Sequence, residues 1–393
     1  MDGIVDTATG YYDEAACDLE EFRSLISQVI SPASVPYAAE IKKNVPIYET
    51  PRVLPLLNDP DNRPKVLSEW AQVLRSGPGV IAIRGAYSDK AVLDQATAIY
   101  EEIIAAEKQA AKAGADHFAA SGANDRIWNS LQKLCEADPE VFVRYFANVP
   151  IAAACEAWLG PNYQMTAQVN LVHPGGAAQQ AHRDYHLGFQ TADISARYPA
   201  HVHDLSPALT LQGAIAHCDM PVDSGPTKLL PFSQAYRPGY AAWRRDDFRE
   251  LFEERCVQIA LGKGDVVFFN PALFHAAGAN TTKDIHRMAN LLQVSSAFGC
   301  AMENIDRLAM CKLVYPHIVR AKAENALSAG EISAAIAATA EGYSFPTNLD
   351  RDPPTNGLAP ETQNAYLHRA LAENTEATQV FQDLDEMKAR QSA

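Results

Sequence analysis

The middle of the chain constrains the fold most, because its apolar residues come in short runs rather than long ones. Between residues 163 and 296 these runs are rich in β-branched and aromatic side chains and are separated by Gly, Pro and Asp. This texture predicts many short strands, as in a sandwich or a barrel. The expected strands cover residues 165–172, 182–189, 208–218, 228–231, 256–261, 265–269 and 288–296.

Both flanks of this region carry apolar residues at helical spacing. The expected helices cover residues 13–30, 65–75, 88–113, 138–148 and 150–159 before it, and 304–323, 332–338 and 365–388 after it. A short strand is expected at 80–84, and the Pro-, Asn- and Asp-rich segment 31–64 indicates an irregular arm. No linker marks a second independent domain. We therefore expect one domain over residues 1–393, with a helical part at 1–160, a β core at 161–300 and a helical extension at 301–393.

Charge and cysteine content exclude several classes of partner. The 393 residues carry a net charge of −15, which argues against nucleic acid or an anionic membrane as the main partner, since both require a basic surface. The seven cysteines are scattered without a C-x-x-C pair, which is typical of a reducing compartment. We see neither a signal peptide nor a run of about 18 apolar residues, and expect a cytoplasmic protein.

One short motif in the β region carries potential metal-binding chemistry. His182 and Asp184 are two residues apart, so in a strand they would point to the same face, together with His186. One imidazole and one carboxylate make up two thirds of a facial iron site, which needs a second histidine from elsewhere. His275, which follows an aromatic run, is the candidate. The H-x-D triplet alone is a weak pattern, and a structural histidine bonded to a neighbouring carboxylate would also explain it.

The order of motifs around this triplet resembles the phytanoyl-CoA dioxygenase family of iron(II)- and 2-oxoglutarate-dependent oxygenases. The matching segments are His182-Arg183-Asp184, Ser224-Gly225-Pro226-Thr227-Lys228-Leu229-Leu230-Pro231-Phe232-Ser233, Gly264-Asp265-Val266-Val267-Phe268-Phe269, His275-Ala276-Ala277-Gly278-Ala279-Asn280 and Arg287. The family usually has proline, glycine, serine and histidine where this chain has Pro231-Phe232-Ser233-Gln234. This departure lies outside the three residues that matter for a metal. The resemblance covers about residues 165–295.

The resemblance implies a double-stranded β-helix, a jelly-roll relative of the cupins, wrapped by N- and C-terminal helices. It implies that His182, Asp184 and His275 bind iron(II) and leave three positions for 2-oxoglutarate and O2. Arg287 would hold the distal carboxylate of 2-oxoglutarate, because a guanidinium is always charged and can bind a carboxylate through two hydrogen bonds. Without the motif, Arg287 would be interpreted as part of a surface salt bridge.

Further residues near the motif have weaker predicted roles. Gln180 has the same parity as His182 and could hydrogen-bond the cosubstrate or the substrate, and Thr227 is a second candidate of this kind; a purely structural role is an equal alternative for each. His186 is interpreted as pocket lining or core, because a fourth protein ligand would fill a position that oxygen needs. Aromatic residues that could line a substrate pocket are Trp128, Tyr185 and Phe189.

The resemblance implies a dioxygenase, with one catalytic domain, that hydroxylates a small organic molecule and converts 2-oxoglutarate to succinate and CO2. Desaturation, epoxidation, ring closure and endoperoxide formation remain open alternatives, as does a catalytically silent cupin-like binding protein. Halogenation is disfavoured because related halogenases replace the carboxylate ligand, whereas Asp184 is present. An acyl-CoA substrate is not inherited from the family name, since the only basic residues near Lys228 and Arg237 are Arg244 and Arg245. The sequence does not indicate an oligomeric state.

Overall fold

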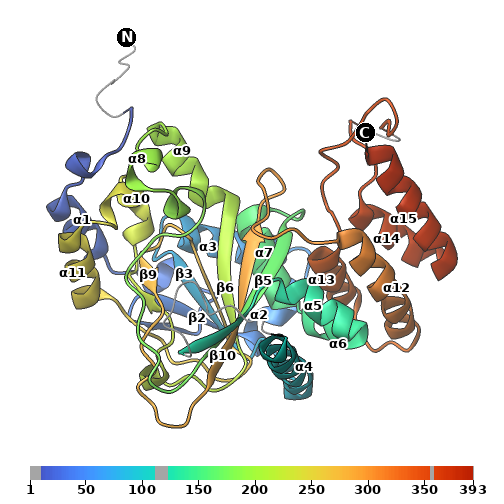
Figure 1. Cartoon of the computed structure of the whole chain (residues 1–393), viewed down its shortest axis with the longest axis horizontal. Coiled ribbons are helices and arrows are strands. Elements are labelled where there is room, and N and C mark those ends of the chain that lie inside the picture. Colours follow the sequence, from blue (N-terminus) through green and yellow to red (C-terminus); the bar gives the residue numbers. More distant parts are fainter. Residues whose placement is uncertain (1–9, 111–122, 355–357, 393) are drawn as a thin grey trace.

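The computed structural model describes residues 10–110, 123–354 and 358–392 and places two sheets face to face (Figure 1). The larger sheet has eight strands in the order β1-β2-β3-β8-β6-β10-β5-β4, and the smaller sheet pairs β7 with β9. The strands are β1 (Glu40–Lys42), β2 (Val45–Glu49), β3 (Val80–Arg84), β4 (Asn124–Ile127), β5 (Gln164–Val172), β6 (Thr210–Ala216), β7 (Lys228–Leu229), β8 (Val266–Phe269), β9 (His275–Ala276) and β10 (Arg287–Ser295).

Helices flank and cover the sheets. The α-helices are α1 (Leu19–Ile26), α2 (Thr50–Leu57), α3 (Arg63–Arg75), α4 (Lys90–Gln109), α5 (Ser130–Ala137), α6 (Pro139–Phe146), α7 (Val149–Leu159), α8 (Ala192–Ser195), α9 (Ala200–Leu205), α10 (Gly239–Ala242), α11 (Asp246–Arg255), α12 (Arg307–Ala323), α13 (Ala329–Thr339), α14 (Gln363–Glu373) and α15 (Ala377–Gln391). Within the described ranges, none combines the length and the apolar character that a membrane crossing requires.

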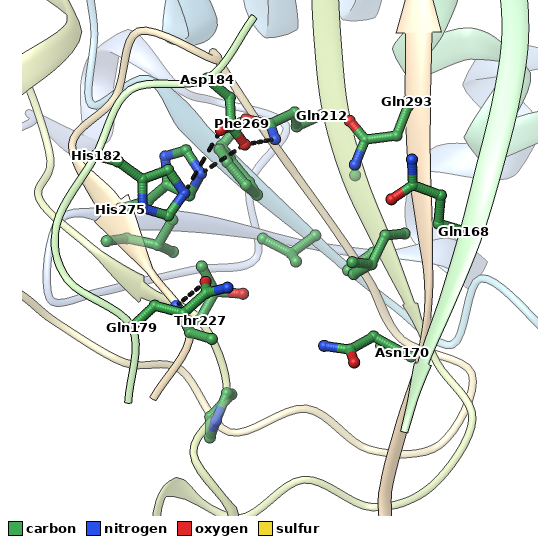
Figure 2. Close-up of a pocket in the computed structure, with 18 of the residues that line it drawn as sticks. Gln168, Asn170, Gln179, His182, Asp184, Gln212, Thr227, Phe269, His275 and Gln293 are labelled. Carbon is green, nitrogen blue, oxygen red and sulfur yellow. Dashed lines mark hydrogen bonds and ion pairs between the residues drawn. The ribbon is translucent and has the colours of Figure 1, made fainter. Parts of the chain in front are cut away.

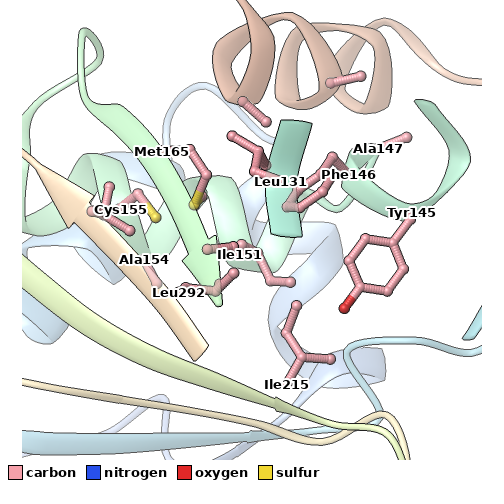
Figure 3. Close-up of a cluster of buried hydrophobic side chains, with 14 of the residues drawn as sticks. Leu131, Tyr145, Phe146, Ala147, Ile151, Ala154, Cys155, Met165, Ile215 and Leu292 are labelled. Carbon is pink, nitrogen blue, oxygen red and sulfur yellow. The ribbon is translucent and has the colours of Figure 1, made fainter. Parts of the chain in front are cut away.

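The helix-covered face of the larger sheet forms the main hydrophobic core. Met288, Leu292 and Val294 of β10 belong to this buried cluster and lie on one face, because side chains alternate between the faces of a strand. Figure 3 shows how the helical side chains of Leu131, Phe146 and Ile151 meet strand residues. Full burial of one such side chain stabilises the fold by roughly 1.5–3 kcal/mol. This packing holds the larger sheet in place as the platform for the opposite face.

The opposite face of the larger sheet turns toward the smaller sheet. Val267 and Phe269 of β8 form a second buried cluster with Leu229 of β7 and with Ile259 and Leu261. β6 is buried along its whole length because it is covered on both faces. Two facing sheets with an apolar layer between them, surrounded by helices, confirm the jelly-roll core with helical additions.

Most strands of the β core lie where the sequence predicts them, but two expected strands are absent. Residues 182–189 form a single backbone bridge at His182 and then a 3-10 helix at His186–Phe189, and residues 256–261 form only isolated bridges. The first prediction was wrong because Tyr185 and His186 adopt positive φ angles of 62° and 39°. Residues other than glycine rarely adopt a positive φ, and this backbone conformation ends an extended segment. His186 therefore does not share a strand face with His182 and Asp184.

The prediction of an irregular arm at residues 31–64 was also wrong. This segment contains β1, β2 and the helix α2. β2 pairs in parallel with β3, and its residues Val45, Ile47 and Tyr48 are completely buried. The Pro and Asn residues that indicated a loop lie mainly at the ends of these short elements. β4 and α5 were missed because short elements with several polar residues have no clear periodicity.

Candidate active site

A cavity of about 590 Å³ opens on the face of the larger sheet that is turned toward the smaller one (Figure 2). Its floor is built by alternate residues of neighbouring strands. From β10 these are Arg287, Ala289, Leu291 and Gln293. This volume lies within the range of about 300–1,000 Å³ that is usual for small-molecule sites. The cavity is therefore large enough for an organic substrate together with a small cosubstrate.

His182, Asp184 and His275 meet at one side of this cavity. Their ligand atoms all lie within 4.8 Å of one another. The Nε2 atom of His182 lies 3.6 Å from Asp184 Oδ1, and the Nε2 atom of His275 lies 3.3 Å from Asp184 Oδ2. The structure thus brings together the three residues that the sequence predicted as metal ligands.

Backbone hydrogen bonds join the two segments that carry these residues. The N–H of His182 donates to the carbonyl of His275 at 3.0 Å, and the N–H of His275 donates back to the carbonyl of His182 at 3.2 Å. The N–H of Asp184 donates to the carbonyl of Pro271 at 3.1 Å. The positions of the three side chains are therefore fixed by local pairing and do not depend on a continuous strand.

Both imidazoles are oriented by their second ring nitrogen. The Nδ1 atom of His182 is 2.8 Å from the carbonyl oxygen of Gln180, and that of His275 is 2.8 Å from the carbonyl oxygen of Leu273. A carbonyl oxygen only accepts, so each Nδ1 carries the proton. Each Nε2 is then a free lone pair that faces Asp184. Histidines that bind metals are commonly oriented in this way.

Asp184 is held by a side chain that the sequence analysis did not identify. The Nε2 group of Gln212 on β6 donates a hydrogen bond to Asp184 Oδ2. Burial disfavours the charged carboxylate, but His182, His275 and Gln212 together outweigh this effect and hold the pKa of Asp184 well below its usual range. Burial also lowers the pKa of His182. The site thus favours an ionised carboxylate at Asp184, which is the form that binds a metal ion.

Arg287 lines the same cavity at the start of β10. It is only 6% exposed, and its Nη1 group donates to the carbonyl oxygens of Ser224 and Gly278. Burial lowers the pKa of Arg287 to about 10. Among the described residues no carboxylate forms an ion pair with it. A buried guanidinium of this kind is a suitable partner for a carboxylate of a ligand.

The weaker candidates Gln180 and Thr227 also line the cavity. Gln180 is exposed, and its backbone carbonyl is the group that orients His182. The side chain of its neighbour Gln179 accepts a hydrogen bond from the Ala277 N–H, next to Thr227 in Figure 2. The predicted contacts of Gln180 and Thr227 with a cosubstrate stay predictions.

The other residues near the motif are distributed between the cavity and the surrounding structure. Trp128 and Phe189 line the cavity. Tyr185 is buried, and the Nδ1 atom of His186 lies 2.9 Å from the hydroxyl oxygen of Ser206. His186 is not part of the described group of candidate metal ligands. The bend after Asp184 thus separates His186 from the site.

The sequence of the chain matches the family model of phytanoyl-CoA dioxygenase (PhyH) over residues 77–289. The matched range spans more than half of the chain and contains His182, Asp184, His275 and Arg287. The chain therefore belongs to the phytanoyl-CoA dioxygenase family, and the site described above is that of an oxygenase-type enzyme. A comparison with curated proteins found no match.

Comparison with solved structures gives remote similarities. The non-heme alpha ketoglutarate dependent epimerase SnoN from nogalamycin biosynthesis is 19% identical, with a TM-score of 0.40, over 60% of this chain and 84% of its own. The carbocyclase SnoK from the same biosynthesis is 22% identical, with a TM-score of 0.43, over 58% and 83% of the two chains. EvdMO1 is 15% identical, with a TM-score of 0.43, over 58% and 50%.

Proposed function

We propose that this protein is an iron(II)- and 2-oxoglutarate-dependent dioxygenase that hydroxylates a small organic molecule. The observation that carries the proposal is the convergence of His182, Asp184 and His275, whose ligand atoms lie within 4.8 Å of one another at the edge of a cavity. Two imidazoles and one carboxylate on one side of an ion are the ligand set of non-heme iron(II) oxygenases, which leave the remaining positions open.

The donor set fits iron(II) because every ligand atom is already oriented. Both histidines present Nε2 to the same point, and Asp184 is held there by Gln212. Hydrogen bonds of this kind, made to residues that bind a metal, raise metal affinity and fix ligand geometry. His182, Asp184 and His275 would hold the ion, and the cavity side remains free for 2-oxoglutarate, O2 and the substrate.

Arg287 fits the distal carboxylate of 2-oxoglutarate. It is a buried cation without a carboxylate partner in the part of the chain that the structure describes, and it lies in the same cavity as the candidate ligands. The carbonyl oxygens of Ser224 and Gly278 hold its Nη1 group, which leaves other N–H groups of the fork for a ligand. Thr227 and Gln180 would contribute further hydrogen bonds to the cosubstrate.

Bound iron would supply the oxidative chemistry that couples decarboxylation of 2-oxoglutarate, with succinate and CO2 as products, to attack on a substrate C–H bond. The side chains of the protein perform the remaining tasks. Arg287 and the triad fix the cosubstrate, and the apolar residues Leu229, Leu261 and Phe269 exclude water from it. Desaturation, epoxidation, ring closure or endoperoxide formation would use the same groups. The complete donor set disfavours a silent binding protein.

The test is to remove one ligand at a time. We expect Asp184→Ala and His275→Ala to lose stoichiometric iron(II) and the formation of succinate, because two remaining ligands bind iron weakly. The melting temperature should change little, since neither side chain contributes to the main hydrophobic core. His201→Ala, which alters an exposed histidine, is the matched control and should keep both properties. Normal iron content in either ligand variant would refute the assignment.

A further inference from the structure

Four carboxamide side chains line the cavity on the sheet opposite the metal-ligand triad. They are Gln212 on β6, Gln293 on β10, and Gln168 and Asn170 on β5, and we call them the carboxamide strip. Figure 2 shows Gln293, Gln168 and Asn170 across the cavity from His182 and His275, with Gln212 between the two groups. Gln212 and Gln293 are directly paired in the sheet. The strip therefore starts at the candidate metal site and extends away from it.

The far end of the carboxamide strip, at Gln293, lies too far from Arg287 to bind 2-oxoglutarate, whereas Asn170 is paired with Ala289, two residues from Arg287. Arg287 and Gln293 are on the same face of β10 and are separated by six residues. At about 3.3 Å per residue, their backbone positions are roughly 20 Å apart. A cosubstrate with five carbon atoms, fixed at Arg287 and at the triad, leaves Gln293 and its neighbours to contact a second ligand. The position of the strip thus points to the substrate.

The protein uses only part of the hydrogen-bonding capacity of the strip. Gln293 is 7% exposed, and its carboxamide makes no hydrogen bond with any residue that the structure describes. The Nε2 group of Gln212 is bound to Asp184, and its Oε1 atom is buried without a partner. The Oε1 atom of Gln168 accepts a hydrogen bond from Arg126 at 3.0 Å, and the Oδ1 atom of Asn170 accepts one from Asn124 at 3.2 Å, so these two side chains are partly paired. The Nε2 group of Gln168 lies 3.6 Å from the sulfur atom of Met302. Buried amides that lack partners are unfavourable, so a ligand that supplies these bonds gains affinity.

Amides in the interior away from the cavity behave differently. The Nδ2 group of Asn280 donates to the carbonyl oxygens of Val172 and Ile285. The Nδ2 group of Asn290, on the opposite face of β10, donates to the hydroxyl groups of Tyr100 and Tyr145. These amides are satisfied by the fold itself. Gln293 differs from both, because neither end of its carboxamide has a hydrogen-bond partner among the described residues.

We propose that the substrate is a neutral molecule with several hydroxyl or carbonyl groups, which bind along the carboxamide strip. A carboxamide has both a donor and an acceptor, and rotation of its last bond presents either end, so it recognises oxygenated groups without charge. This inference rests on the proposed function, because it defines the substrate class of the same site. An aliphatic acyl chain would leave Gln293 and the Oε1 atom of Gln212 unpaired, and a site with polar groups rejects a ligand that cannot pair with them.

Binding of matched probes to the anaerobic protein with iron(II) and 2-oxoglutarate tests the proposal. The probes are 1,5-dihydroxynaphthalene, its O-methylated counterpart 1,5-dimethoxynaphthalene, and palmitoyl-CoA, each measured by isothermal titration calorimetry. We expect the dihydroxy compound to bind about ten-fold more tightly than the dimethoxy compound, which cannot donate. Palmitoyl-CoA should bind more weakly than the dihydroxy compound.

Variants then assign this preference to the strip. Gln293→Leu and Asn170→Leu should each reduce the affinity ratio of the dihydroxy to the dimethoxy compound to about three-fold or less. Two variants are used because Gln293 is buried, where leucine is harder to accommodate, whereas Asn170 is only half-buried. We expect the Asn170 variant to fold whether or not the Gln293 variant does. Gln382→Leu, an exposed glutamine on α15, is the matched control and should keep the ratio.

Three results would overturn the proposal. They are failure of the dihydroxy compound to bind, equal or tighter binding of the dimethoxy compound or palmitoyl-CoA, and an unchanged ratio in both strip variants. Failure of the proposed function has a different signature, because it appears as absence of iron in metal analysis and absence of succinate. The titration, repeated without iron and 2-oxoglutarate, measures the preference of the strip independently of both.

Discussion

At the scale of single residues, the candidate metal ligands are positioned by groups that are not themselves ligands. The carbonyl oxygens of Gln180 and Leu273 orient the two imidazoles, and Gln212 holds Asp184. Such bonds reduce the reorganisation that binding of an ion requires. The histidines and the carboxylate therefore adopt a binding arrangement as a consequence of the fold.

Arg287 gives a prediction at this scale. We expect Arg287→Ala to weaken 2-oxoglutarate binding by roughly ten- to a hundred-fold, since a charge-assisted hydrogen bond contributes about 1.5–3 kcal/mol. Arg287→Lys should recover only part of the affinity, because an ammonium group keeps the charge but not the planar fork. The measurement is a titration of 2-oxoglutarate into the anaerobic iron(II) protein. Iron content serves as the control and should not change. Wild-type cosubstrate affinity in Arg287→Ala would place the carboxylate anchor elsewhere.

The residues of this site could be predicted from the sequence only in part. His182, Asp184, His275 and Arg287 were identified by their order and spacing, which a family motif preserves. The strand that was expected to align His182 and Asp184 does not exist, because Tyr185 and His186 have positive φ angles that the sequence does not signal. Gln212 was missed although it is a polar residue in a predicted apolar strand, which is a signal that could have identified it.

At the scale of the elements, β6 links the site to a buried polar network on the helix side. His217 follows β6 directly, and its ring lies 2.8 Å from the hydroxyl oxygens of Thr97 on α4 and Tyr145 on α6. The same tyrosine accepts a hydrogen bond from Asn290 on β10. These contacts fasten two strands of the sheet to two helices. Burial, with a smaller contribution from the charge of Lys263, lowers the pKa of His217 to about 3.

This network predicts how stability depends on pH. The unfolded chain takes up a proton at His217 below pH ~6.5, whereas the folded protein does so only near pH 3. The free energy of unfolding should therefore fall as the pH is lowered between these values, by up to about 1.4 kcal/mol per pH unit from this residue. His217→Gln removes that contribution and should flatten the dependence in urea unfolding between pH 4 and pH 7. His201→Gln is the exposed control, and equal slopes in His217→Gln and the wild type would contradict the prediction.

The elements were predicted with uneven success for a physical reason. β5, β6, β8 and β10 were predicted because each consists of a clear apolar run that is covered by other parts of the protein. β2 and β4 depend on pairing with distant strands, and local sequence does not report such pairing. β1 has only three residues and pairs with β2 alone. The helix expected at 365–388 is divided into α14 and α15 at Asn374, which has a positive φ of 54°.

At the scale of the whole molecule, the C-terminal helices are attached to the β core through Arg307. This buried residue at the start of α12 donates to the carbonyl oxygen of Met165 on β5 at 2.8 Å. It also donates to the carbonyl oxygens of Ala338 and Thr339 at the end of α13, and it pairs with Glu341. One side chain thus connects the core to two helices of the segment 301–393. That residues 1–393 form a single domain stays a prediction.

A substitution of Arg307 tests that prediction. We expect Arg307→Met to lower the free energy of unfolding by about 3 kcal/mol, because hydrogen bonds from a charged group are lost while the packing volume is kept. If the chain is one domain, the variant should still unfold in a single transition at a lower melting temperature in differential scanning calorimetry. Arg351→Met, on an exposed loop near the C-terminus, is the control and should unfold like the wild type. Two separate transitions would instead show that 301–393 is an independent unit.

The cavity that Arg287 and the carboxamide strip share has a further consequence for inhibition. Arg287 near one end of β10 and Gln293 of the carboxamide strip near the other line the same cavity, so both ligands occupy the same volume. A molecule that links a dicarboxylate head to a neutral oxygenated group could contact both ends at once. The second contact is then intramolecular, and such bivalent molecules can exceed either fragment in affinity by roughly 10²–10⁴. Competition assays should find this molecule competitive with 2-oxoglutarate and with substrate alike, whereas each fragment alone displaces one of them.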